Sequence, residues 1–78
     1  MPTVLRVKGY RLSFFSYDLN EPIHVHVTKA GCEAKIWMSP VSLAWSKGFR
    51  DVELREILAI VEENQNVIES AWNERSGN

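Results

Sequence analysis

The sequence predicts an α+β protein with the order ββββα, in which two successive hairpins form a four-stranded antiparallel sheet and a C-terminal helix packs on one face. Two turn signals, Lys8-Gly9 and Lys29-Ala30-Gly31, each separate two strand-like segments. Around the second turn, apolar residues alternate with polar ones, as in a half-buried strand. After Asp51 they follow a helical period instead. We expect residues 1–78 to form a single domain.

The first hairpin is expected from residues 4–7 and 10–15. Gly9 accepts the positive φ that a tight turn requires. A two-residue turn would place Val7 opposite Tyr10, Leu5 opposite Leu12, Arg6 opposite Arg11 and Val4 opposite Ser13. Residues 17–22 follow as a loop, because Asp, Asn and Pro favour turns.

The second hairpin is expected from residues 23–28 and 32–38, whose alternations agree on one register. That register pairs Thr28 with Glu33, His26 with Lys35, and His24 with Trp37. A slip of one residue would send every side chain to the wrong face. Ser39-Pro40 ends the fourth strand, because proline has no N–H to donate to a ladder.

A connection and a helix complete the chain. Residues 41–48 are interpreted as a connection that carries a turn of helix, with Leu43, Ala44 and Trp45 covering an edge of the core. The helix begins at about Asp51. Its apolar stripe comprises Leu54, Ile57, Leu58, Val61, Ile68, Ala71 and Trp72. Asn64-Gln65-Asn66 interrupts the stripe, which predicts one long kinked helix or two short helices in line.

The predicted sheet has two different faces, because successive side chains of a strand point to opposite sides. The apolar face packs on the helix and comprises Leu5, Val7, Tyr10, Leu12, Phe14, Val25, Val27, Ala34 and Ile36. One helix leaves the other face uncovered. The candidate binding surface lies on that uncovered face and comprises Arg6, Arg11, Phe15, His24, His26, Lys35 and Trp37.

Basic side chains among aromatic rings on an open sheet face suit more than one partner. A small cognate protein would cover the rings, and so would a second copy in a homodimer. RNA would stack its bases on the rings and set its phosphates on the cations. His24, His26 and Lys35 are candidate catalytic residues for metal-independent RNA cleavage, with the 2′-hydroxyl as nucleophile. We expect no metal or other cofactor, because two histidines fall short of a zinc ligand set.

The composition bears on the class of protein. An apolar fraction of 45% argues against disorder, and the single Cys32 excludes an internal disulfide. Charges near the N-terminus do not fit a signal peptide, and no apolar run reaches the roughly 18 residues of a membrane helix. We therefore expect a cytoplasmic protein that does not enter a membrane.

Charge is distributed unevenly between the two parts of the chain. Residues 1–49 carry six Lys or Arg and three acids, whereas residues 50–78 carry three Arg and seven acids.

Four segments together carry a family resemblance. They are Gly9-Tyr10-Arg11, Pro22-Ile23-His24-Val25-His26-Val27, Ala34-Lys35-Ile36-Trp37 and Trp72-Asn73-Glu74. The chain resembles the small bacterial and archaeal proteins of the domain-of-unknown-function family 4160. Ile23 stands where many members have a second Pro, and Arg50 where others have a Ser. The resemblance implies a cytoplasmic protein without an established activity, often encoded beside another small protein, as in toxin–antitoxin modules. It assigns no catalytic residue.

Overall fold

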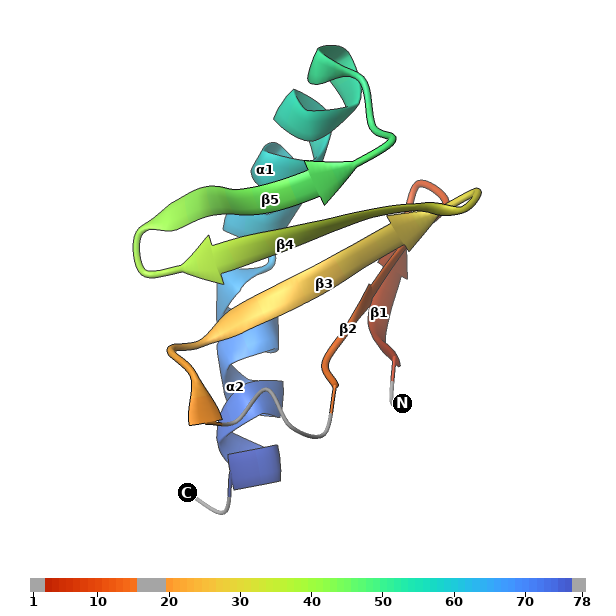
Figure 1. The fold of residues 1–78 in the computed structure, drawn as a ribbon. Coiled ribbons are helices and arrows are strands. Elements are labelled where there is room, and N and C mark those ends of the chain that lie inside the picture. Colours follow the sequence, from red (N-terminus) through yellow and green to blue (C-terminus); the bar gives the residue numbers. More distant parts are fainter. Residues whose placement is uncertain (1–2, 16–19, 77–78) are drawn as a thin grey trace.

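The computed structural model describes residues 3–15 and 20–76, which form five strands followed by two helices (Figure 1). The elements are β1 (Thr3–Val7), β2 (Tyr10–Ser13), β3 (His24–Lys29), β4 (Cys32–Met38), β5 (Val41–Lys47), α1 (Asp51–Glu63) and α2 (Gln65–Ser76). The strands form one antiparallel sheet in sequence order. The α+β class is confirmed, but the sheet has five strands rather than four. Residues 17–19, half of the expected loop, lie outside the described residues.

Both predicted hairpins are present, and each turns through two residues with positive φ. The φ angles are 53° and 85° at Lys8 and Gly9, and 51° and 82° at Ala30 and Gly31. Two successive positive φ angles belong to the type I′ turn, whose twist matches that of the strands. The predicted register of the second hairpin is confirmed in full.

The register of the first hairpin departs from the prediction at its open end. Three of the four predicted pairs are present, but the register shifts between Thr3 and Leu5. Thr3, rather than Val4, therefore opposes Ser13. An irregularity of this kind leaves one residue without a cross-strand partner, which counting back from the turn does not anticipate. Strand β2 also ends at Ser13, two residues earlier than expected.

The interpretation of residues 41–48 as a connection with helical character is wrong, because residues 41–47 form β5. The chain reverses at Ser39-Pro40, and β5 then pairs with β4 from Met38 back to Glu33. Proline ends β4 as predicted, yet it does so inside a hairpin turn. Leu43 and Trp45 are exposed, so they do not cover the core.

A β-bulge at Ala44 decides which way the side chains of β5 point. Leu43 opposes Ile36 and Trp45 opposes Lys35, so Ala44 is the additional residue between them. Residues directly opposite each other share a face of the sheet. Leu43 therefore lies on the face of Ile36, and Trp45 lies on the face of Lys35.

The helical region begins at Asp51 as predicted and breaks at one residue. Arg50 precedes the first turn, and its backbone N–H donates to the Glu53 carboxylate at 2.9 Å. Asn64 separates α1 from α2, and its carbonyl accepts the backbone N–H of Ile68 at 3.0 Å. The predicted interruption is therefore confirmed. Neither of the described helices has the length and apolar run needed to cross a bilayer.

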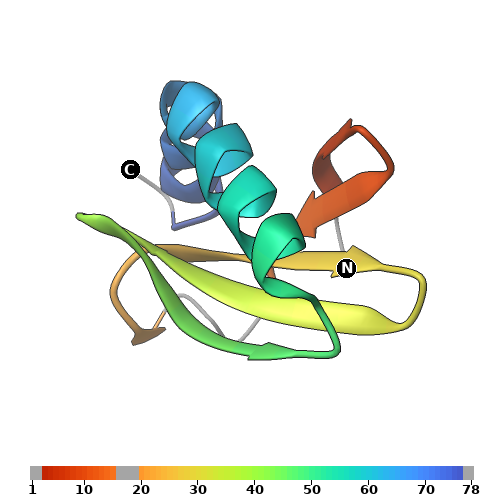
Figure 2. The same ribbon diagram turned by 90° about the horizontal axis from the view of Figure 1, so that it is seen from above.

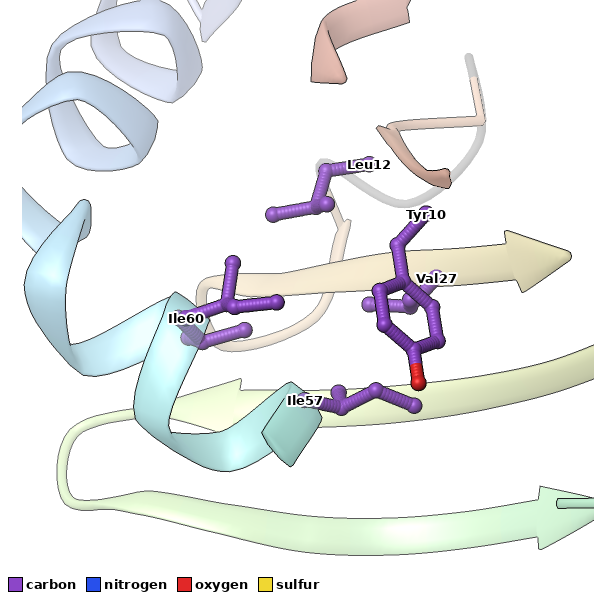
Figure 3. Close-up of a pocket in the computed structure, with 6 residues that line it drawn as sticks. Tyr10, Leu12, Val27, Ile57 and Ile60 are labelled. Carbon is purple, nitrogen blue, oxygen red and sulfur yellow. The ribbon is translucent and has the colours of Figure 1, made fainter. Parts of the chain in front are cut away.

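The core lies between the sheet and the helices. Figure 2 shows both helices on one side of the β3–β5 layer, with the β1–β2 ribbon turned up beside α1. Figure 3 shows the side chains that converge between β2, β3 and α1, which are Tyr10, Leu12, Val27, Ile57 and Ile60. The space between them has no room for a water molecule. The predicted stripe packs here, since Ile57 and Val61 are buried.

Candidate functional site

The register places the predicted binding residues together on the face opposite α1. Direct cross-strand pairs join Arg6 with Arg11, His26 with Lys35, and His24 with Trp37. Phe15 follows β2, and its ring contacts the His26 ring at 4.1 Å between centroids. Trp45 joins the same face through the bulge. We call this set the histidine face, made of Arg6, Arg11, Phe15, His24, His26, Lys35, Trp37 and Trp45.

The prediction that both imidazoles are open to solvent is wrong. His24 is 0% exposed and His26 is 5% exposed. Arg6 is exposed, while Arg11, Phe15, Lys35 and Trp37 are half-buried. The alternation of a strand identifies the face on which a side chain lies, but it does not show which neighbouring side chains cover it.

His24 is enclosed by tryptophans from two elements. Its ring centroid lies 5.4 Å from that of Trp37 in β4 and 5.3 Å from that of Trp72 in α2. The Nδ1 atom lies 2.8 Å from the carbonyl oxygen of Pro22. A carbonyl oxygen only accepts, so this contact requires the proton of His24 on Nδ1. The hydrogen bond and the two aromatic contacts together fix the orientation of the ring.

His26 is held by an acid from the neighbouring strand. Its Nδ1 lies 3.2 Å from Oε2 of Glu33. The carboxylate accepts the Nδ1–H, so His26 also carries a proton on Nδ1. Phe15 covers the ring on one side, and Trp45 lies 6.4 Å away between centroids.

Both histidines and all three tryptophans of the chain therefore form one aromatic cluster. The two imidazole centroids are 5.2 Å apart, and each imidazole contacts at least one indole. Trp72 also belongs to the main core, so the cluster joins the start of β3 to α2. Among residues 3–15 and 20–76, no three His, Cys, Asp or Glu side chains gather in a way that could hold a metal ion.

The cations of the histidine face are positioned by neighbouring groups. The Lys35 ammonium lies 2.6 Å from the Glu21 carboxylate and 4.6 Å above the Trp37 ring. The Arg11 guanidinium donates to the Thr3 hydroxyl at 2.7 Å. Of these two cations, Lys35 lies beside an aromatic ring, and its ammonium is also paired with the Glu21 carboxylate.

The aromatic side chains that solvent reaches on the histidine face are indole and phenyl rings rather than imidazole rings. A groove of about 230 Å³ is lined by Pro22, Ile23, Trp37 and Ser39, next to the buried His24. Trp45 is 43% exposed at the edge of the sheet. Trp45 is not among the residues predicted for the binding surface. The alternation of Val41, Leu43 and Trp45 would have revealed a strand, although only the bulge shows the face of Trp45.

A separate charged cluster lies at the start of α1, away from the histidine face. The Tyr10 hydroxyl donates to the Glu56 carboxylate at 2.9 Å, and the Lys29 ammonium lies 4.5 Å above the Tyr10 ring. Burial and then the contact with Glu56 raise the pKa of Tyr10 to about 12. The backbone hydrogen bond from Arg50 lowers the pKa of Glu53. These contacts tie β2 and β3 to the helix and indicate a stabilising role.

Comparison with known proteins gives one match. The family model for the domain of unknown function DUF4160 matches residues 9–73, which include every residue of the histidine face except Arg6. No curated protein and no solved structure matches significantly.

Proposed function

Since the chain belongs to the family of the domain of unknown function DUF4160, whose name assigns no activity, we propose from its geometry that it is a protein-interaction module. It binds a small cognate protein through the histidine face. The observation that carries the proposal is the exposed Trp45 on the same face as the half-buried Trp37 and the cations Arg11 and Lys35. Trp and Arg are enriched where protein interfaces gain most of their binding energy.

The distribution of charge indicates the chemistry of the partner. The five strands carry five Lys or Arg and one acid, whereas the two helices carry two Arg and seven acids. Complementary charge speeds association and selects the orientation of binding. The proposed partner therefore presents an acidic surface to the strands, and it is repelled by the helices.

The form of partnership that we propose is one half of a toxin–antitoxin-like pair in the cytoplasm. The family resemblance supports this form, because members are often encoded beside a second small protein. A tight complex with that neighbour would cover the aromatic surface that the free chain exposes.

Amide chemical shifts test the proposal. A library of acidic peptides is titrated into the isotope-labelled protein, and the expected shifts fall on Arg11, Lys35, Trp37 and Trp45. Shifts confined to α1 and α2 would remove the proposal. Trp45→Ala is expected to weaken binding by about tenfold, because truncation of an interface tryptophan typically costs more than 1 kcal/mol. Val67→Ala is the matched control, since Val67 is an exposed apolar residue on α2.

RNA is the second candidate ligand, and Trp45 is again the observation that favours it. An exposed indole beside cations is a stacking platform for single-stranded bases. A uridine-rich oligonucleotide in the same titration separates the candidates. Binding of the oligonucleotide but not of the acidic peptides would favour RNA. Cleavage by the wild type that is lost in both His24→Ala and His26→Ala while both variants remain folded, with Arg55→Ala unaffected, would support the candidate catalytic residues.

A further inference from the structure

Strand β5 forms one edge of the sheet, and among the described residues it pairs only with β4. Figure 2 looks onto this side of the molecule, and neither helix crosses β5 in that view. The outer edge of a strand presents backbone N–H and C=O groups that can pair with another extended chain.

Apart from the bulge at Ala44, this edge lacks the features that usually prevent such pairing. The seven residues of β5 include no proline and a single charge, Lys47, at the end of the strand. The opposite edge, β1, is shorter, carries Arg6 near its centre and has an irregular register. Both edges have an irregular register, but the shorter length and the central charge protect only β1, so β5 is the more receptive of the two.

Apolar side chains flank the outer edge of β5 on both faces. Leu43 is 39% exposed and Trp45 is 43% exposed, and these are two of the four exposed large apolar residues in the described part of the chain. Because the bulge at Ala44 separates them, Leu43 points to the helix side and Trp45 to the histidine face. A strand laid along β5 would contact one of them on each face.

We infer that the outer edge of β5 accepts an extended acidic and apolar segment of the partner protein as a sixth strand. The inference rests on the proposed function and names the part of the partner that binds. Main-chain hydrogen bonds would supply affinity, and the side chains of alternate residues would supply specificity. Lys47 lies at the end of β5 on the face of Trp45, so an acidic residue of the segment would meet its cation.

A second copy of the chain fits this edge less well. Two β5 strands aligned antiparallel over their full length would centre on Ala44 and place Leu43 of one copy opposite Trp45 of the other. Residues directly opposite each other must share a face, whereas the bulge puts these two on different faces. The basic character of the strands also repels a second basic edge.

The probe is a blocked eight-residue peptide of alternating Val and Glu, titrated into the isotope-labelled full chain. We expect slowed amide hydrogen exchange in alternate residues of β5 and a shift of the Trp45 indole signal. Methylation of every peptide nitrogen removes the donors of both peptide edges, and it is expected to weaken binding by well over tenfold, since several hydrogen bonds of about 1 kcal/mol each are lost. The matching peptide of Val and Lys is expected not to bind.

The outcomes separate the two proposals. In one outcome the methylated peptide binds as tightly as the unmethylated one, shifts the signals of Arg11 and Trp37, and leaves amide exchange in β5 unchanged. That result would contradict binding at the β5 edge but would leave the proposed function standing. Peptides that shift only α1 and α2, or that do not bind, would count against both. The third outcome concerns the protein without peptide. Slow amide exchange in β5 that does not vary with protein concentration, together with a dimeric mass, would show that a second copy occupies the edge and would overturn the inference.

Discussion

The imidazole rings of His24 and His26 lie edge to face with their centroids 5.2 Å apart. Each ring donates its Nδ1 proton to a fixed oxygen, the Pro22 carbonyl for His24 and the Glu33 carboxylate for His26. The two residues that first suggested chemistry on this strand are thus components of a packed cluster. The surface above them, with Trp37 and Trp45, remains accessible for binding.

His24→Ala is expected to destabilise the fold by about 1–3 kcal/mol, because it removes a buried hydrogen bond and the packing of a fully buried ring. The free energy of unfolding in urea measures the effect. Arg55→Ala is the control, since Arg55 is exposed on α1. Equal stability of the His24→Ala variant and the wild type would contradict a packing role.

Gly48→Ala is expected to destabilise the fold more than Gly31→Ala. Both glycines have positive φ, 96° at Gly48 and 82° at Gly31, so both substitutions carry a backbone penalty of about 1 kcal/mol. A Cβ at Gly48 would lie 2.7 Å from the Cys32 sulfur, whereas a Cβ at Gly31 would meet nothing within 4 Å. Chemical denaturation gives the free energy of unfolding of both variants, and the difference between them measures the effect of the contact with Cys32. Identical losses of stability would contradict an effect of that contact.

Stability is expected to fall between about pH 10 and pH 12 through Tyr10. The folded state raises the pKa of Tyr10 from 10.0 to about 12, so it retains the phenol proton after the unfolded chain has lost it. The contribution is therefore complete below pH 10 and disappears as pH rises to about 12. Unfolding free energies measured across this interval should decline less steeply in Tyr10→Phe than in the wild type. Parallel declines would contradict the assignment.

Glu53→Gln is expected to destabilise the protein at neutral pH and to have less effect in acid. The backbone hydrogen bond from Arg50 lowers the pKa of Glu53 below its ordinary value of 4.5, so the stabilisation is present above that value. It is lost as pH falls through the lowered pKa. Thermal unfolding at several pH values, with Glu62→Gln as the control on the exposed side of α1, measures the difference. A difference that stays constant into strong acid would contradict the expectation.

The sequence was sufficient for those parts of the fold that depend on local rules. The Lys8-Gly9 and Ala30-Gly31 turns set the two hairpins, and the alternation around His26 set the register with Lys35. The helix start at Asp51 and the break at Asn64 followed from the apolar period.

The remaining features depend on contacts between distant residues. Strand β5 was missed because proline at position 40 was interpreted as the end of the sheet rather than as a turn within it. The bulge at Ala44 is set by pairing with β4, so no local pattern gives the face of Trp45. The burial of His24 depends on Trp72, which is 48 positions further along the chain and reaches the ring from α2.

The most direct measurement of the central claim is amide hydrogen exchange of the chain, free and in complex with the acidic peptide of alternating Val and Glu. The proposed binding face predicts slower exchange in residues 24–47 of the complex, with α1 and α2 unchanged. Protection confined to residues 51–76 would contradict the claim that the strands, rather than the helices, bind the partner.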